Sequence, residues 1–154
     1  MAMRFSKAGS PLEMALSTVL ANATIMYHRA HGFHWNVVGE GFPQWHDKFA
    51  EIYDDVYGSL DPIAENVRKI GGVPPFSLSD LAFRASVEDA QPADFTVDTL
   101  VADLLETNEG VLESLDTAFV FANQANEQGI ANFLAERIDA HQKWKWQLSV
   151  SLEK

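Results

Sequence analysis

Hydrophobic residues recur in steps of three and four along four long stretches of the chain, whereas the alternation typical of a β-strand is almost absent. Such spacing aligns apolar side chains along one face of an amphipathic helix. The first helix is predicted from Pro11 to about residue 39, because Ser10 can serve as its N-cap and Glu13 completes a capping box. Its apolar stripe consists of Leu12, Leu16, Val19, Leu20, Ala23, Met26, Tyr27 and Ala30.

The same pattern predicts three further helices: one between a turn at residues 39–43 and the glycines at 71–72, one over about 96–122 and one over about 128–152. The long connection between the second and third contains three prolines, yet Ser77 and Asp80 predict a short helix over Leu78–Arg84. Short connections favour antiparallel hairpins, and the long one can cross the bundle. The predicted fold is all-α: a four-helix bundle with a short extra helix in its crossover. It forms one domain over residues 1–154, with 1–9 as a short flexible tail.

The 154-residue chain has a formal net charge of −11 and no cysteine. A chain of this length suits one domain and buries roughly 70% of its unfolded surface. The absence of thiols excludes disulfides, iron–sulfur clusters and cysteine-zinc sites, so histidine and carboxylate chemistry remains. The negative charge disfavours nucleic acid and anionic membranes. No apolar run reaches about 18 residues and no signal-peptide core is visible, so we expect a soluble cytoplasmic protein without a membrane segment.

Four potential metal ligands stand out: His34, His46, Asp61 and Glu65. Asp61 and Glu65 follow His46 by 15 and 19 residues, which puts all three on one helix face. Along the helix axis, however, the two carboxylates lie about 22 Å and 28 Å from His46, at a rise of about 1.5 Å per residue. One ion therefore cannot be shared by these ligands within a single helix.

The two halves of this ligand set can meet between subunits. His34 lies at the same end of the first helical hairpin as His46, because the turn reverses the chain there. A twofold axis across antiparallel copies of the second helix would bring the histidines of one subunit to the carboxylates of the other, which creates two equivalent sites per dimer. Imidazole with carboxylate suits iron, manganese or zinc, and open coordination positions favour redox-active iron.

The segments that contain these ligands resemble the Dps miniferritins, the DNA-binding proteins from starved cells. The resemblance covers nearly the whole chain from the first helix onward and rests on residues 33–39, 46–49, 61–65, 70–72 and 136–143, with Trp146. It implies a ferritin-like bundle assembled into a hollow dodecamer built on twofold dimers. It also implies a ferroxidase site at the dimer interface that oxidises Fe(II), preferably with hydrogen peroxide, and stores Fe(III) in the shell, which protects against oxidative damage. His34 and His46 would come from one subunit, and Asp61 and Glu65 from its partner.

One position departs from the family pattern. Members commonly carry a carboxylate four residues after the second histidine, where this chain has Ala50. Asp47 and Glu51 flank this position, and either could reach a metal through water, with Asp47 the first substitute; the simpler interpretation is that both are solvated surface groups. The gap supports a second hypothesis, in which the protein is a non-enzymatic metal-binding or architectural shell protein with an impaired ferroxidase site.

Pro62 is the other departure, because it falls inside the second helix and cannot donate a backbone hydrogen bond. A kink is predicted near residues 58–62, where Gly58 makes local adjustment easiest. In the alternative interpretation, Asp61 is the N-cap of a fresh helix that begins at Pro62, and no metal is bound.

The other histidines are weaker candidates. His28, His31 and His34 follow at intervals of three and span about 240° of the helix, so they cannot all face one ion. His31 either supports His34 as an orienting partner or has a packing role. His141 is assigned to packing or to contacts between subunits. The Glu-x-x-His motif of ordinary ferritins is absent, which disfavours a site inside one bundle.

Two further expectations concern the tryptophans and DNA. Trp35 and Trp45 are close in sequence to the proposed ligands, and we interpret them mainly as packing or interface anchors that could also quench an oxidant. The termini carry only Arg4, Lys7 and Lys154, in contrast to the lysine-rich tails of family members that bind DNA. So few cations neutralise few phosphates, and DNA binding is not expected.

Overall fold

A computed structural model describes residues 9–154, and every regular element in that range is a helix. The predicted all-α fold is therefore confirmed. The tail predicted over residues 1–9 lies outside the described residues, except for its last position. The helices are α1 (Pro11–Asn36), α2 (Phe42–Lys69), α3 (Leu78–Arg84), α4 (Val97–Gln124) and α5 (Gln128–Ser151).

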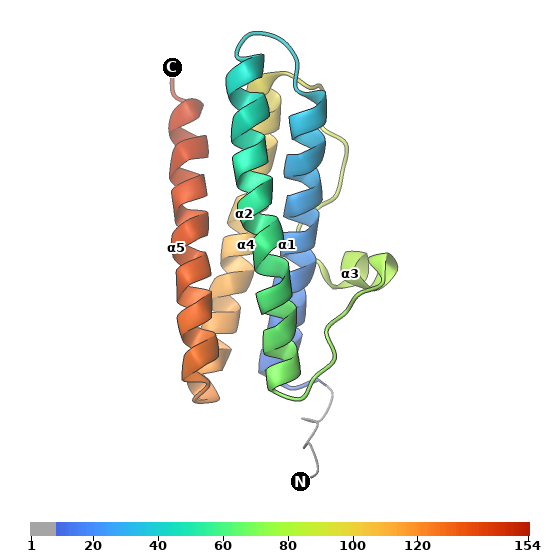
Figure 1. The fold of residues 1–154 in the computed structure, drawn as a ribbon, viewed down its shortest axis with the longest axis vertical. Coiled ribbons are helices and arrows are strands. Elements are labelled where there is room, and N and C mark those ends of the chain that lie inside the picture. Colours follow the sequence, from blue (N-terminus) through green and yellow to red (C-terminus); the bar gives the residue numbers. More distant parts are fainter. Residues whose placement is uncertain (1–8) are drawn as a thin grey trace.

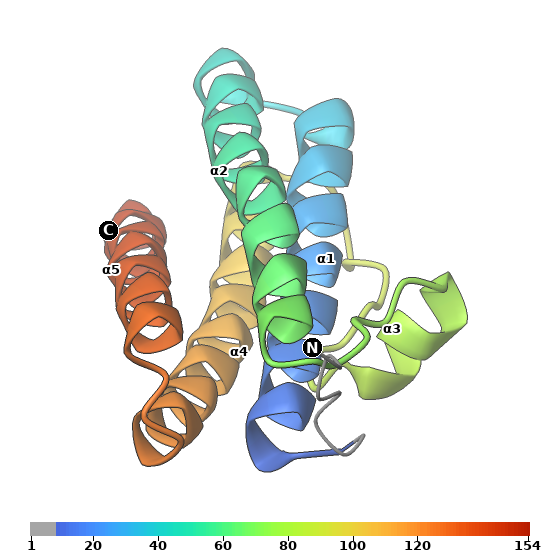
Figure 2. The same cartoon turned by 60° about the horizontal axis from the view of Figure 1, so that its bottom comes forward.

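Four long helices form the bundle, and α3 stands beside it (Figure 1). α1 and α2 are antiparallel, as are α4 and α5, and the crossover after α2 returns the chain to the opposite end of the bundle, where α4 begins. α1 is central to the packing because it contacts α2, α4 and α3. Figure 2 shows α3 on the side of the bundle away from α5. This is the predicted bundle with one crossover and a short extra helix.

The starts of α1 and α3 follow from their caps. Ser10 Oγ accepts a hydrogen bond from Glu13 N at 3.2 Å, and Ser77 Oγ accepts one from Asp80 N at 3.2 Å. Each bond satisfies an amide group that the first helical turn leaves without a partner. The Glu13 carboxylate also accepts a hydrogen bond from Gly9 N at 3.3 Å. Both predicted helix starts are confirmed.

α1 ends at Asn36, earlier than the end predicted near residue 39. The chain is extended after this residue, and Val38 N donates to Phe95 O at 3.0 Å, which ties the crossover to the α1–α2 turn. Gly39 and Gly41 then adopt φ angles of 94° and 85°. Glycine takes this left-handed conformation without the steric cost that a Cβ would bring. The turn places the last residues of α1 beside the first residues of α2.

α2 runs unbroken through Pro62, so the alternative in which Asp61 caps a fresh helix is wrong. The carbonyl that loses its helical partner belongs to Gly58, four residues earlier. Gly58 is exposed, and water can therefore bind that carbonyl. His46, Asp61 and Glu65 accordingly lie on one continuous helix, with the axial separation that the spacing predicts.

The predicted apolar stripes all face one core between the helices. Its largest fully buried side chains include Leu16, Met26, Phe49, Ile52, Ile63, Leu100, Leu104, Leu115, Leu134 and Leu148. Burial of this apolar surface is the main source of the bundle's stability. Within residues 9–154, no helix is both long enough and apolar enough to cross a membrane.

Candidate metal site

His34, in the last turn of α1, and His46, near the start of α2, stack on each other. Their ring centroids are 3.8 Å apart and the ring planes differ by 18°. His34 Nδ1 lies 2.6 Å from the His46 carbonyl oxygen, and His46 Nδ1 lies 2.7 Å from the His34 carbonyl oxygen. A carbonyl oxygen only accepts, so each Nδ1 donates its proton. The two bonds are reciprocal, and each residue therefore holds the ring of the other.

This arrangement leaves both rings ready to bind a metal ion. With the proton on Nδ1, the neutral imidazole carries its lone pair on Nε2. Within the described range, neither Nε2 has a hydrogen-bond partner. Ligand histidines commonly donate their other N–H to a backbone carbonyl, which fixes the tautomer and the ring orientation. The His34 carbonyl is also one of the last in α1, which lack helical partners, so the His46 bond satisfies it.

Asp61 and Glu65 are both exposed on α2. Their separation of four residues places them on the same face of the helix, one turn apart. Among residues 9–154, no three side chains of the metal-ligating types gather closely enough to hold one ion. One subunit thus brings His34 and His46 together and keeps the two carboxylates apart from them.

At the position where the family commonly has a carboxylate, Ala50 is half-buried and offers no oxygen. The Glu51 carboxylate is paired with Lys48, whose Nζ lies 2.7 Å from Oε2. Lys48 also donates to Gln147 Oε1 on α5 at 3.2 Å, which holds the ammonium in place. Asp47 is exposed, and no contact within the described range engages it. Of the two flanking carboxylates, Glu51 has an ion-pair partner and Asp47 has none within the described range.

His31 contacts aromatic neighbours and does not orient His34. Its ring stacks on Tyr53 at 4.1 Å with an interplanar angle of 22°, and its Nδ1 lies 3.1 Å from the Tyr27 hydroxyl. The His34 ring is 6.2 Å away, and its Nδ1 bonds the His46 carbonyl instead. Burial, followed by the charges of His34 and His28, lowers the pKa of His31. His31 is therefore neutral at physiological pH.

A half-buried ion pair links α2 to α5. Arg137 donates to both oxygens of Asp55, at 2.9 Å and 3.0 Å, and Trp144 Nε1 donates to Asp55 Oδ2 at 2.8 Å. Burial alone would raise the pKa of Asp55, but the hydrogen bonds from Arg137 and Trp144 outweigh it and lower the pKa. Asp55 is therefore ionised, and its bonds to Arg137 and Trp144 hold α2 against α5.

His141 extends this network to α4. Its Nδ1 donates to Asn108 Oδ1 at 2.7 Å, Asn108 Nδ2 donates to the His141 carbonyl oxygen at 2.9 Å, and Arg137 Nη2 lies 3.2 Å from His141 Nε2. Arginine only donates, so Nε2 must accept. Burial, and then the Arg137 charge, lower the pKa of His141 to about 3. Both ring nitrogens are engaged, which confirms a packing role and leaves His141 unavailable to a metal.

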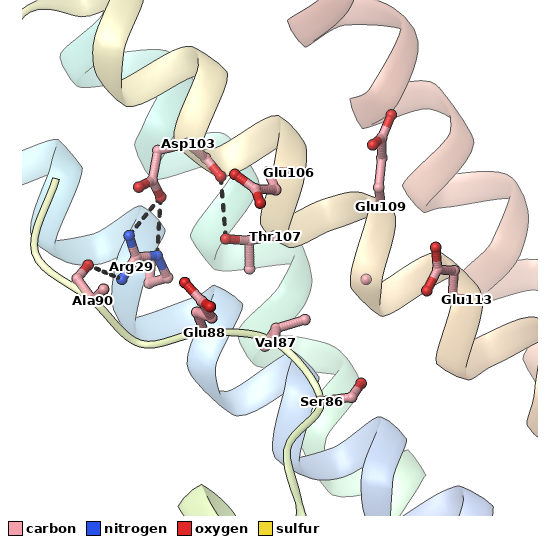
Figure 3. A pocket seen from close by; sticks show the side chains of 11 residues that line it. Arg29, Ser86, Val87, Glu88, Ala90, Asp103, Glu106, Thr107, Glu109 and Glu113 are labelled. Carbon is pink, nitrogen blue, oxygen red and sulfur yellow. Dashed lines mark hydrogen bonds and ion pairs between the residues drawn. The ribbon is translucent and has the colours of Figure 1, made fainter.

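A separate pocket of about 350 Å³ lies between α1, α4 and the crossover (Figure 3). Buried Arg29 forms part of its wall and donates to Asp103 Oδ1 from Nε at 3.1 Å and from Nη2 at 2.5 Å. Arg29 Nη1 donates to the Ala90 carbonyl oxygen at 2.7 Å. Arg29 thus neutralises Asp103 and fastens the crossover to the bundle. The other carboxylates around the pocket are exposed: Glu88, Glu106, Glu109 and Glu113.

The sequence-based prediction assigns no structural role to Asp55, Asn108 or Arg137, although they organise the interior. The available signal is the position of Asn108, which lies on the apolar face of its helix between Leu104 and Val111. A polar residue at a buried position needs a partner, so a polar network could have been expected there. Which residues supply the partners depends on the packing of three helices and is not visible in one sequence.

The ferritin-like domain family matches residues 13–154 of the chain. The DNA protection during starvation protein of Brevibacillus brevis is 30% identical over 138 residues, which are 90% of this chain and 92% of that protein. The crystal structure of a Dps protein from Bacillus brevis matches with a TM-score of 0.87 at 30% identity, covering 92% of this chain and 95% of that one. The Vibrio cholerae Dps protein, described as a member of a broad superfamily of ferritin-like diiron-carboxylate proteins, matches with a TM-score of 0.87 at 25% identity over 92% of this chain and 89% of its own. The chain belongs to the Dps family of ferritin-like proteins.

Proposed function

We propose that this protein is an iron-storing miniferritin that oxidises Fe(II) with hydrogen peroxide at a site shared by two subunits. Membership in the Dps family supports iron storage as the general class of function. The specific proposal depends on one observation: His34 and His46 hold each other's rings through Nδ1 and leave both Nε2 atoms free. Two histidines with only a packing role would not require that both Nε2 atoms remain without a hydrogen-bond partner.

The carboxylates reach this pair from the partner subunit. Two nitrogen ligands alone bind Fe(II) weakly, and hard oxygen ligands favour the Fe(III) product. Asp61 and Glu65 are exposed on the same helix as His46 but about 22 Å and 28 Å along its axis. An isologous contact between antiparallel α2 helices completes two equivalent sites, since each subunit supplies what the other lacks.

The chemistry needs only iron and peroxide as substrates. Two Fe(II) ions each give one electron to hydrogen peroxide, the O–O bond breaks, and two protons complete two water molecules. His34 and His46 bind Fe(II) through neutral Nε2, while Asp61 and Glu65 neutralise the charge that grows on oxidation to Fe(III). Zinc or manganese suits the same mixture of nitrogen and oxygen ligands and would compete with iron.

Mixed shells test whether the site is shared. His46→Ala and Asp61→Ala subunits should each form shells that oxidise Fe(II) slowly, measured by ultraviolet absorbance after anaerobic Fe(II) loading and peroxide addition. When the two variants are unfolded together and reassembled at equal amounts, about a quarter of the sites regain all four ligands, because half of the dimers are mixed and each holds one intact site. Recovery of activity supports the shared site. Reassembled mixtures that stay as slow as the single variants would refute it.

Ala50 bears on the second iron. We infer that one metal position is complete and that the other relies on Asp47 and water, because Lys48 holds Glu51. Ala50→Asp should increase the number of Fe(II) ions bound per site in anaerobic calorimetry, whereas the control Ala50→Asn should not. Equal stoichiometry in Ala50→Asp and the unchanged protein would contradict this. If neither protein oxidised Fe(II), the alternative of an architectural shell with an impaired site would replace the leading proposal.

The proposed assembly is a homo-oligomer, a dodecamer built on twofold dimers, that works in the cytoplasm. Several curated relatives are named DNA protection during starvation protein. For this chain we propose protection by removing iron and peroxide and not by coating DNA, because its formal net charge is −11. A strongly acidic surface repels the phosphate backbone.

A further inference from the structure

A groove runs along the seam between α1 and α4 and begins at the N-terminal end of α1. Its first part, of about 520 Å³, is mostly apolar, and its wall includes Met14, which is 56% exposed, and half-buried Phe121. Its second part is the pocket of about 350 Å³ that Arg29 borders. Both parts include Ser86 and Glu113, which Figure 3 shows at the end of the second part away from Arg29. The two parts therefore form one continuous α1–α4 groove.

The α1–α4 groove carries negative charge that no cation of the described residues neutralises. Its exposed carboxylates without an ion-pair partner among residues 9–154 are Glu88, Glu106 and Glu113. Arg29, the cation in its wall, is already paired with Asp103. Lys145 on α5 is paired with Glu109. An occupant that carries both an apolar side chain and positive charge is therefore complementary to the groove.

The segment that precedes Gly9 has this composition. Residues 1–8 lie outside the described part of the chain, and their sequence contains two cations and no acidic residue. Phe5 is the largest apolar side chain of the segment, and the cations Arg4 and Lys7 lie on either side of it. The charge and the apolar content of the segment thus match those of the groove.

The segment joins the described chain beside the groove and is long enough to enter it. Gly9 is followed closely by Pro11, which belongs to the wall of the apolar part. Of the α1 residues in that wall, Thr18 lies farthest from the helix start, about 12 Å along the axis from Ser10 at a rise of about 1.5 Å per residue. Eight residues can span up to about 28 Å when extended. A second hollow beside Pro11 contains Lys69, whose ammonium repels the cations of the segment, so charge favours the α1–α4 groove.

We propose that residues 1–8 of each chain bind in its own α1–α4 groove. Phe5 packs against Met14 in the apolar part. Arg4 pairs with Glu113, where the acidic part begins. Burial of the Phe5 ring supplies most of the affinity, because an exposed ion pair contributes less than a buried aromatic side chain. The ion pair makes binding depend on salt, and it keeps Arg4 from phosphate groups and other anions. The inference goes beyond the proposed iron chemistry and does not depend on it.

Trypsin tests the binding in the full-length assembled protein, because a segment held in the groove is protected from cleavage after Lys7. Relative to a free peptide of the same sequence, cleavage followed by mass spectrometry should be slow at low salt and faster in about 1 M salt, where the screening length is about 3 Å. Glu113→Gln should accelerate cleavage by up to about fivefold, which corresponds to one exposed ion pair. Phe5→Ala should accelerate it more. The matched control Glu136→Gln changes an exposed glutamate on α5 and should leave the rate unchanged. Equal rates in the unchanged protein, Glu113→Gln and Phe5→Ala would overturn the inference.

Disulfide trapping locates the bound segment, and the absence of native cysteine makes each engineered pair of thiols unique. Thr117 is exposed in the wall of the α1–α4 groove, whereas Lys69 lies in the other hollow. Ser6→Cys combined with Thr117→Cys should form a disulfide within one chain, which keeps the mass of a single subunit in a denaturing gel without reductant. The control pair, Ser6→Cys with Lys69→Cys, should form its disulfide far more slowly. Equal trapping in the two pairs, no trapping in the Thr117 pair, or a link between two chains would contradict the inference.

Discussion

Acid should destabilise this protein through one buried histidine. His141 is 1% exposed, its Nδ1 donates to Asn108, and its Nε2 faces the Arg137 guanidinium. A proton on Nε2 would replace an accepting atom by a donating one beside a cation. Burial, followed by the Arg137 charge, lowers the pKa of His141 from an ordinary value of 6.5 to about 3. The unfolded chain therefore binds a proton on His141 under conditions in which the folded chain does not.

The sign and size follow from linkage. Because the folded pKa is the lower one, the full stability is present above pH 6.5 and is lost as the pH falls from 6.5 toward 3. One pKa unit corresponds to about 1.4 kcal/mol, so His141 removes about 2 kcal/mol per subunit between about pH 7 and about pH 5. Asp55 also has a lowered pKa, and its contribution is lost only below its ordinary value of 3.8. Above about pH 5, the loss of stability therefore comes from histidine and not from Asp55.

Urea unfolding of metal-free protein measures this loss, with tryptophan fluorescence, to which buried Trp144 contributes, as the signal. A series of protein concentrations separates subunit dissociation from unfolding. His141→Gln removes the titrating group, so its stability should fall by about 2 kcal/mol less than that of the unchanged protein over the same interval. The exposed His28→Gln serves as the control and should behave like the unchanged protein. Equal losses in the unchanged protein and in His141→Gln would refute the reasoning.

Three further outcomes are expected. Asp55→Asn removes one partner of the ion pair with Arg137, in which the Asp55 side chain is 31% exposed. This change should lower the free energy of unfolding, measured in urea, by about 2 to 4 kcal/mol. The control Asp54→Asn, at an exposed position, should change it by no more than about 0.5 kcal/mol. Arg29→Met removes the bond to the Ala90 carbonyl, so amide hydrogen exchange should accelerate in the crossover near residues 86–92; unchanged protection there would contradict its anchoring role. In gel-shift assays at low salt without magnesium, DNA should not be retained, and tight retention would overturn the charge argument.

Most of the fold could be predicted because its signals are local. The spacing of apolar residues and the caps at Ser10 and Ser77 depend on a few neighbouring positions, so helix existence and order are predicted correctly. The end of α1 is less well predicted, since Val38 leaves the helix to bond Phe95, a residue far away in the chain. Periodicity contains no information about such a long-range partner.

For the candidate site too, some features could be predicted from the sequence and others could not. The spacing of His46, Asp61 and Glu65 along one helix already predicts that a single subunit cannot gather them, because a helix has a known rise per residue. The aromatic surroundings of His31 could not be predicted, since Tyr27 and Tyr53 are members of apolar stripes in the sequence. Their contacts depend on how α1 and α2 rotate against each other, and only the packed structure determines that rotation.

If the proposed site is split between subunits, the reciprocal bonds between His34 and His46 would keep its histidine half rigid. A ligand pair on two separate helices normally depends on tertiary packing for its alignment, yet here each ring is held by the backbone beside the other ring. The short turn with Gly39 and Gly41 sets the course of the two backbones, so the two histidines are already aligned within one subunit. Asp61 and Glu65 are exposed, so in the proposed site they would be the half that adapts. On the proposed arrangement, assembly brings flexible oxygen ligands to fixed nitrogen ligands, which limits the ordering that metal binding requires.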